Sequence, residues 1–148
     1  MNSRTSLLAL AFVVGFASCS DDPVASEAPT APLPWAAFEM SGRILGPVSQ
    51  DDRSDIEITL RETAGVAASL NLVRLTCSNR ATQEWGAATF VAERGTNRID
   101  ALATLVFRRS YVCPSSGRPA ELLAELTDAN GHSIRITAAP FHPDWPGA

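Results

Sequence analysis

The sequence predicts an all-β fold, an antiparallel β-sandwich of about seven short strands that follows a signal peptide and a disordered tether. Three observations support this prediction. Apolar and polar residues alternate with period two along several runs, as they do in half-buried strands. Stretches rich in Gly, Pro, Asn and Ser separate these runs at short intervals. Near the C-terminus, two runs flank a loop sequence that is typical of a β-hairpin.

The N-terminus has the pattern of a secretory signal. Arg4 is followed by an apolar run over residues 7–16, and the small residues Ala17 and Ser18 come directly after it. A basic start, a short apolar core and small residues at a cleavage point define such a signal, and this run is too short to span a bilayer comfortably. We therefore expect residues 1–18 to be removed on export.

The junction Phe16-Ala17-Ser18-Cys19 resembles the lipobox of bacterial lipoproteins, although Phe16 stands where that family usually has Leu. The resemblance implies cleavage before Cys19, a lipid such as palmitate on its sulfur, and an acylated new N-terminus. The membrane would then be one partner of the protein. By resemblance to lipoprotein sorting, Ser20 points to the outer membrane of the cell envelope. The alternative is an ordinary signal peptide that leaves Cys19 as a spectator thiol.

The number of cysteines agrees with lipidation. The chain has three, Cys19, Cys77 and Cys113, and an odd count in an exported protein leaves one thiol to explain. Lipid on Cys19 leaves an even pair in an oxidising compartment, where disulfides persist.

Composition separates a tether from a folded domain. Residues 20–34 are mainly Pro, Ala, Ser and acidic residues, and such a segment cannot bury enough apolar surface to offset its ordering entropy. Trp35 is the first large residue that could anchor a core. We therefore expect residues 19–34 to form the lipidated residue and its tether, and residues 35–148 to form one sandwich domain.

Charge excludes some classes of function. Removal of residues 1–18 takes away only Arg4, so the formal charge changes from -4 to -5. A mildly acidic chain is a poor ligand for nucleic acid, so we expect no such partner. All 12 basic residues are arginines, which excludes a Schiff-base lysine.

The strands differ in how clearly they are marked. Ile56, Ile58 and Leu60 alternate with polar residues and predict a half-buried strand. Residues 99–107 have alternating apolar residues on both faces, as in a more interior strand. Weaker runs lie at residues 36–45, 70–77 and 87–92. A slip of phase between Leu72 and Val73 indicates a bulge.

Residues 119–126 support two interpretations. Their helix propensity is high, with a proline at a plausible first position. A hairpin with the loop 129–131 instead places Leu126 opposite Ile134, Ala124 opposite Ile136 and Leu122 opposite Ala138, so apolar residues face each other. The loop also suits a type I turn with Gly131 in the left-handed position. We favour the strand and keep the helix as the alternative.

Three segments, residues 71–76, 95–99 and 126–132, resemble turns and strands of immunoglobulin-like or fibronectin type III-like modules of bacterial envelope proteins. The resemblance covers residues 69–139 and implies an immunoglobulin-like antiparallel β-sandwich. Its motifs are structural turns, so it implies little about function.

Strand parity predicts a disulfide between Cys77 and Cys113. Cys77 closes the third predicted strand and Cys113 follows the fifth, so both reach the same end of the sandwich if each connection reverses direction. If the third strand lies beside the start of the sixth, the two cysteines come within bonding reach.

The sequence contains few candidates for catalysis. His132 lies in the predicted hairpin turn and is expected to be solvated, and His142 lies in a proline-rich tail beside Asp144. A nucleophile needs an adjacent base held by a third group, and no such spacing is present. The acidic run at residues 51–55 lacks the offsets of a calcium loop. We expect no enzyme, no cofactor and no metal.

Aromatic residues give the one positive indication of binding. Trp35 and Trp145 are expected to cover the ends of the sandwich core, which leaves Trp85 as the possible ligand contact in an exposed loop. The predicted function is that of an envelope lipoprotein whose domain is a non-catalytic binding or structural module for an unknown protein or glycan. The alternative is a carbohydrate-recognition module that uses loop aromatics.

Overall fold

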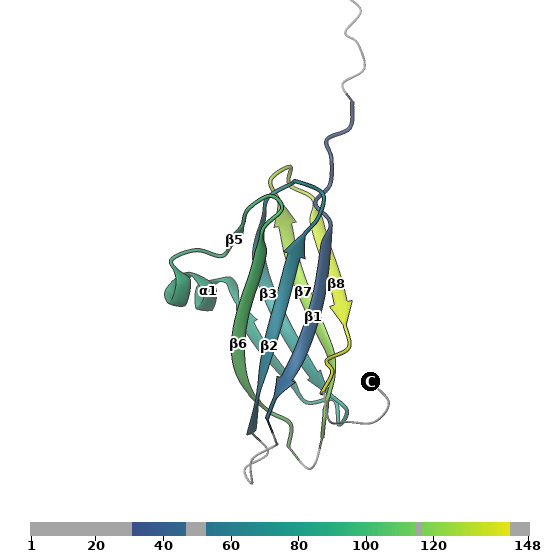
Figure 1. Cartoon of the computed structure of the whole chain (residues 1–148), viewed down its shortest axis with the longest axis vertical. Helices are drawn as coiled ribbons and strands as arrows, with labels where there is room; N and C mark the ends of the chain where they lie inside the picture. Colours follow the sequence, from purple (N-terminus) through teal and green to yellow (C-terminus); the bar gives the residue numbers. More distant parts are fainter. Residues whose placement is uncertain (1–30, 47–52, 115–116, 143–148) are drawn as a thin grey trace, which may run out of the picture. The chain divides into compact units, whose positions relative to one another are not determined.

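The computed structural model describes residues 31–46, 53–114 and 117–142. Within these ranges the chain forms eight strands and one helix, all inside a compact unit from Pro32 to Ala148 (Figure 1). In chain order the elements are β1 (Phe38–Leu45), β2 (Arg53–Glu62), β3 (Ala68–Cys77), β4 (Thr82–Gly86), α1 (Ala87–Arg94), β5 (Arg98–Ile99), β6 (Thr104–Val112), β7 (Pro119–Asp128) and β8 (Ser133–Ala138).

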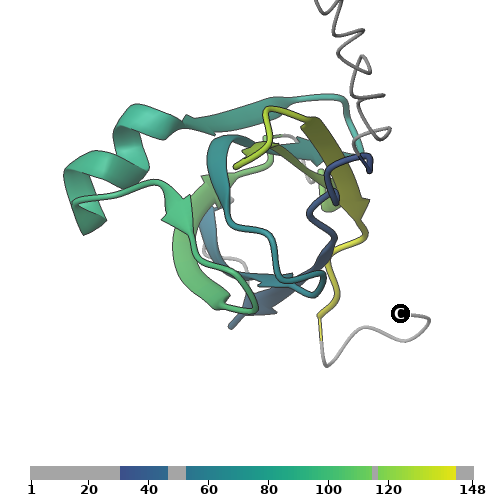
Figure 2. The same ribbon diagram turned by 90° about the horizontal axis from the view of Figure 1, so that it is seen from above.

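The strands form two antiparallel sheets. One has the order β1-β2-β6, and the other has the order β4-β3-β7-β8 with the short β5 paired to β3. Viewed along the strands, the two sheets enclose a common interior, with α1 outside it (Figure 2). The predicted fold class, an immunoglobulin-like antiparallel β-sandwich, is confirmed.

The core is built from the inward residues of both sheets. In β2 these are Ile56, Ile58 and Leu60, which are fully buried, so the predicted alternation of this strand is confirmed. In β7 they are Leu122, Ala124 and Leu126. The last inward-facing residue of each of these two strands is a carboxylate, Glu62 in β2 and Asp128 in β7. These two side chains are central to the site described below.

The β7–β8 hairpin has the predicted register. Leu126 pairs with Ile134, Ala124 with Ile136 and Leu122 with Ala138. Gly131 closes the turn with a φ of 86°, and its N–H donates to the carbonyl of Asp128 at 3.0 Å. The strand interpretation of residues 119–126 is confirmed, and the helix alternative is wrong because pairing with β3 and β8 outweighs local helix propensity.

The predicted disulfide is also present. Cys77 and Cys113 are bonded with their Cα atoms 5.7 Å apart. Cys77 closes β3 opposite Pro119 at the start of β7, which is the strand neighbourhood that parity required. Cys113 directly follows β6, so the bond connects the two sheets.

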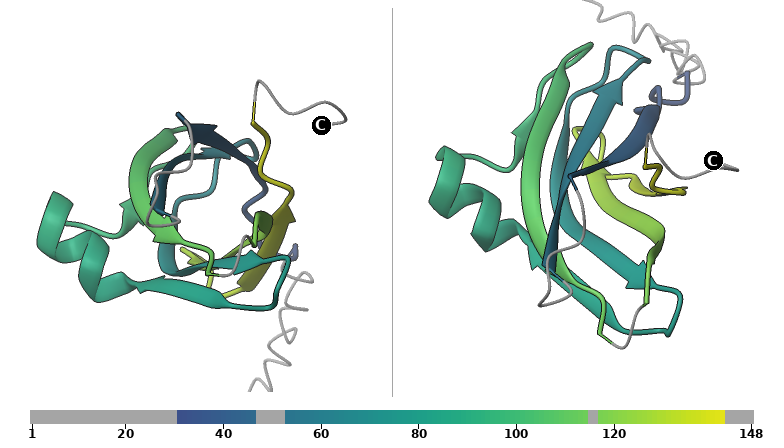
Figure 3. Two further views of the ribbon diagram at one scale, coloured as in Figure 1. Left: turned by 90° about the horizontal axis from the view of Figure 1, so that it is seen from below. Right: turned by 60° about the horizontal axis from the view of Figure 1, so that its bottom comes forward.

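Both edges of the β1-β2-β6 sheet have neighbours beyond the sheet. At the β1 edge, Phe141 accepts from the N–H of Ile44 and donates to the carbonyl of Gly42, each at 2.9 Å. Beside the β6 edge lies α1, seen outside the sandwich in Figure 3. Its buried Phe90 packs edge-on against Phe107 with ring centroids 5.1 Å apart. Covering an edge in this way limits pairing with other chains.

Three local predictions are wrong. Residues 87–92 were expected to form a strand but belong to α1, which is framed by Gly86 and by Gly95 with a φ of 77°. The expected strand over residues 99–107 is interrupted at residues 100–103 by a turn in which Leu102 has a φ of 58°. The bulge predicted in β3 is confirmed, but its predicted position is wrong, because the register shifts between Leu70 and Leu72 and not between Leu72 and Val73.

Candidate functional site

The end of the sandwich where residues 32–37 lead into β1 carries two buried carboxylates, each of which accepts several hydrogen bonds. We call this end the proximal pole and residues 32–37 the lead-in segment. The β2–β3 loop (residues 63–67), the β5–β6 turn (residues 100–103) and the β7–β8 turn (residues 129–132) surround it (Figure 1). The disulfide lies at the opposite end, which we call the distal pole.

Asp128 is the first buried carboxylate of the proximal pole. Its side chain is fully buried, and it accepts from the backbone N–H groups of His132 at 2.8 Å, Asn130 at 2.9 Å and Ala36 at 3.2 Å. The ring Nδ1 of His132 lies 2.9 Å from its Oδ2 atom. Burial raises the pKa of Asp128, but the hydrogen bonds from His132, Ala36 and Asn130 outweigh burial and lower the pKa to about 2.

Glu62 is the second. It is 1% exposed and accepts from the backbone N–H groups of Ala64, Gly65 and Leu102, each at 2.8 Å, and from that of Ala37 at 3.3 Å. Burial raises the pKa of this carboxyl, and the backbone donors, Leu102 first among them, lower it to about 2. Both carboxylates are therefore charged across the physiological pH range.

The two carboxylates bind consecutive residues of the lead-in segment. Asp128, from the β4-β3-β7-β8 sheet, holds the amide of Ala36, and Glu62, from the other sheet, holds that of Ala37. We call this arrangement the carboxylate clamp. Two further bonds reinforce it: Thr63 N–H donates to the Ala37 carbonyl at 2.8 Å, and the Asn130 side-chain amide donates to the Pro34 carbonyl at 2.6 Å. The clamp fixes the lead-in segment to both sheets.

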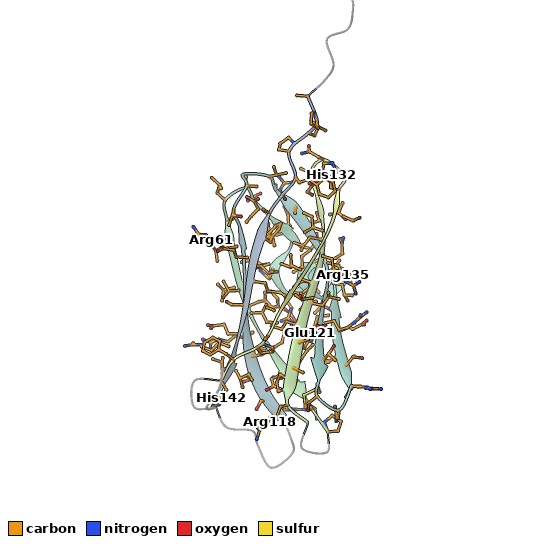
Figure 4. The ribbon with its side chains drawn as sticks, turned by 90° about the vertical axis from the view of Figure 1, so that its right-hand side faces the viewer. Arg61, Arg118, Glu121, His132, Arg135 and His142 are labelled. Atoms are coloured by element: carbon orange, nitrogen blue, oxygen red, sulfur yellow. A yellow bond between two sulfur atoms is a disulfide. The ribbon has the colours of Figure 1, made fainter. Side chains whose placement is uncertain are left out.

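An ordered aromatic stack lies beside the clamp. The rings of Trp35 and His132 are parallel within 6° with their centroids 4.1 Å apart. Asp128 orients the His132 ring, and Trp35 stays 60% exposed. Figure 4 shows His132 at the end where the lead-in segment joins the domain. His132 is thus more than a solvated turn residue, and the expectation that Trp35 covers the core is wrong because its ring stacks on the surface of the turn.

The expected exposure of Trp85 is wrong. Trp85 lies in β4, pairs with Val73 of β3 and is 9% exposed within the core. It was expected in an exposed loop, but it belongs to β4, which extends to Gly86 and turns the indole inward. A role for Trp85 as an exposed ligand contact does not fit this burial.

The remaining predicted residues lie elsewhere. His142 lies outside any strand or helix, as expected, but it is only 7% exposed near the distal pole, where its Nε2 atom lies 3.2 Å from the Gly46 carbonyl oxygen (Figure 4). Cys19, Asp144 and Trp145 lie outside the described residues. Within the described ranges, no three His, Cys, Asp or Glu side chains gather as a metal site would require. In that same part of the chain, α1 is the only helix, and it is too short to cross a bilayer.

Arg109 forms a second buried polar cluster, between β6 and α1. Its Nη1 atom lies 2.8 Å from Glu93, and its guanidinium carbon lies 5.0 Å and 5.3 Å from the ring centroids of Phe90 and Phe107. The side chain is 10% exposed. An ion pair and two cation–π contacts thus hold α1 against β6. They also remove Arg109 from the solvent, where an anion would have to approach it.

Two shallow depressions lie on the sheets. One of about 300 Å³ is lined by Asn71, Glu125, Leu126, Ser133, Ile134 and Arg135, and another of about 320 Å³ by Glu39, Met40, Ser41, Thr59 and Arg61. In each, the acidic and basic side chains already lie near one another, with N–O distances of 3.7 Å and 3.8 Å. Neither therefore presents an uncompensated charge to a ligand.

Sequence reasoning missed the clamp, although its signal was present. Glu62 is two residues after Leu60, so the alternation that turns Ile56, Ile58 and Leu60 inward also turns this carboxylate inward. Asp128 continues the phase of Leu126 in the same way. A carboxylate at an inward position is costly unless several donors satisfy it, and this cost is the mark of a structural or functional role.

No protein-family model matches the chain, and no curated protein matches it. Solved structures give distant likenesses. Structural genomics target SoR45 is 17% identical, with 72% of this chain and 83% of that chain covered and a TM-score of 0.47. The putative ApaA protein from Bordetella pertussis is 15% identical, with 74% and 95% covered and a TM-score of 0.46. The CARDB domain of PF1109 from Pyrococcus furiosus is 12% identical, with 70% and 94% covered and a TM-score of 0.35.

Proposed function

We propose that the protein is an envelope lipoprotein, anchored by lipid on Cys19, whose β-sandwich serves as a non-catalytic binding or structural module. The observation that carries the proposal is the use of the three cysteines. Cys77 and Cys113 are bonded to each other, so Cys19, at the lipobox-like junction, is the one cysteine left to modify. A disulfide also agrees with export to an oxidising compartment.

The carboxylate clamp supports a structural role for the proximal pole. General acid–base catalysis favours a pKa near the working pH, and the pKa values of Glu62 and Asp128 are both about 2. Their oxygens are also occupied by backbone donors. The clamp is instead suited to hold the domain firmly at the end of its tether.

Lipidation is tested by Cys19→Ala in cells that are fed labelled palmitate. The wild type is expected to incorporate the label and to partition into detergent, whereas the variant should do neither and should keep its signal peptide. The matched control is Cys77→Ala with Cys113→Ala, which should still take up the label because only Cys19 lies at the junction. A wild type that stays unlabelled and aqueous would contradict the proposal. Fractionation of the labelled envelope then tests the outer-membrane location.

A carbohydrate-recognition module is the second candidate, and one observation favours it. Trp35 presents an ordered, exposed ring, and such a ring can stack on a sugar. The test is titration of tryptophan fluorescence with envelope glycans. A saturable change that Trp35→Ala abolishes would support this candidate, and a flat response would exclude it for the glycans used.

A further inference from the structure

Three large apolar side chains are exposed on the lead-in segment and the turns of the proximal pole. Leu33 is 57% exposed, Trp35 60% and Leu102 69%. Leu33 and Trp35 belong to the lead-in segment, and Leu102 belongs to the β5–β6 turn. Glu62 joins the two segments, because it accepts from both Ala37 and Leu102. The three side chains therefore come from segments that meet at one end of the domain.

Leu102 is the least expected of the three. Its φ of 58° lies in the left-handed region, where Gly and Asn are the usual residues. A glycine could make the same backbone bond to Glu62 without strain, and an asparagine with less. A strained backbone and an exposed aliphatic side chain both lower the stability of the fold. Positions that lower stability in this way cluster at functional sites. Leu102 therefore indicates a contact outside the domain.

Trp35 is prepared for contact in another way. Its ring is stacked on His132, which Asp128 holds, and the next residue, Ala36, is bound by the same carboxylate. A side chain that is already ordered loses little entropy when it binds. An exposed indole also prefers the boundary between lipid and water, where its apolar body and its N–H can both be satisfied.

The length of chain between Cys19 and the lead-in segment limits how far the proximal pole can lie from a lipid on Cys19. Residues 20–33 separate Cys19 from Pro34, and a chain of that length spans at most about 50 Å. The proximal pole is the end of the domain that is nearest to Cys19 along the chain. If Cys19 is lipidated, this pole stays within that distance of the bilayer. The effective concentration of the pole at the lipid surface is then high, so even a weak contact can form.

We infer that the proximal pole docks on the bilayer surface, with Leu33, Trp35 and Leu102 inserted into the interfacial layer. The inference rests on the proposed lipid anchor. A glycan is the less favoured occupant, because the polar side chains beside Trp35 are already used within the domain. Asp128 holds His132 and the Ala36 amide, and the Asn130 amide holds Pro34.

The disulfide provides a way to test docking apart from lipidation in cells. With Cys77 and Cys113 bonded, residues 19–148 carry one free thiol, Cys19, which can be coupled to a maleimide phospholipid in phosphatidylcholine vesicles. Brominated acyl chains then quench any indole that reaches the interface. We expect quenching at least twofold stronger for the wild type than for Leu102→Asn or Trp35→Phe. Asparagine suits the left-handed backbone, so Leu102→Asn removes the apolar group and keeps the fold.

Each outcome decides the inference. Equal quenching in the wild type and in Leu102→Asn would overturn it, as would Trp35 emission that bromine leaves unchanged. A wild-type dimer, with Cys19 capped, that Leu102→Asn dissociates would show that a second copy covers the pole, and would overturn it too. So would saturable binding of a soluble glycan at Trp35 that Leu102→Asn leaves intact. Failure of palmitate labelling in cells would remove the proposed anchor without changing the vesicle result, so the two failures are distinguishable.

Discussion

Replacement of Glu62 by Gln tests the carboxylate clamp with one changed atom. Gln keeps one acceptor oxygen and turns the other into an NH₂ group, which cannot accept. The less costly orientation points the nitrogen at the donors of Ala64 and Ala37, because the bond from Ala37 is already long at 3.3 Å. An unsatisfied buried donor costs about 1 to 3 kcal/mol, so one short and one long bond together predict a loss of about 3 kcal/mol in the free energy of unfolding.

The measurement is urea unfolding at pH 7 without reductant, supported by thermal melts. For a domain of this size, a loss of 3 kcal/mol corresponds to a decrease in Tm of roughly 15 °C. Glu121→Gln is the matched control, since Glu121 is exposed on β7 and surface substitutions usually stay within about 0.5 kcal/mol. If Glu62→Gln is no more destabilising than Glu121→Gln, the clamp does not hold the proximal pole together.

The same pair of proteins has a defined pH dependence. The pKa of Glu62 falls from its ordinary 4.5 to about 2 on folding, so the folded state binds fewer protons than the unfolded state between these values. The carboxylate therefore contributes its full stability above pH 4.5 and loses it as the pH falls towards 2. Gln does not titrate, and Asp128 titrates in both proteins. The difference in stability should thus shrink between pH 4.5 and 2, and a constant difference would refute a charged Glu62.

Two further predictions concern the hairpin and the disulfide. Gly131→Val should lower stability by about 2 kcal/mol, since a β-branched residue is strained at a φ of 86°, whereas Gly131→Asn should cost less; a melt unchanged by valine would argue against this turn. Loss of the bond between Cys77 and Cys113, 36 residues apart, should cost about 4 kcal/mol on the chain-entropy model. Thiol counting on denatured, unreduced mature protein checks the bond directly, and free thiols from both cysteines would contradict it.

The fold could be predicted where its signal was local or periodic. The alternation of Ile56, Ile58 and Leu60 marked β2, and the loop ending at Gly131 fixed the register of the β7–β8 hairpin. That register decided against a helix over residues 119–126, because on one face of the hairpin it placed Leu122, Ala124 and Leu126 opposite apolar residues. The disulfide then followed from counting chain reversals. The strand expected over residues 87–92 is in fact α1, but the short strand β4 just before it takes its place in the count. The number of chain reversals between Cys77 and Cys113 is therefore still even.

The errors came from features without a periodic signal. The helix α1 has eight residues and one buried side chain, Phe90, too few for a helical period to stand out. Leu102 has a left-handed backbone conformation, which a leucine in the sequence does not predict because Gly and Asn are the usual residues there. The Trp35–His132 stack joins residues 97 positions apart, so it exists only because the fold brings the lead-in segment to the β7–β8 turn. The inward carboxylates could have been found, since parity alone placed Glu62 and Asp128 in the interior.

The sandwich is joined across its sheets at both ends by different chemistry. At the distal pole, the Cys77–Cys113 bond ties the end of β3 to the residue after β6, and this link depends on neither pH nor the tether. At the proximal pole, the clamp ties Glu62 and Asp128 to the lead-in segment, and this link depends on two charges and on the presence of that segment. A force applied at residue 32 therefore acts first on the hydrogen bonds of Ala36 and Ala37 to the two sheets, and only then on the pairing of β1 with β2. Residues 36 and 37 consequently act as part of the domain, and any free movement of a tether must occur before them.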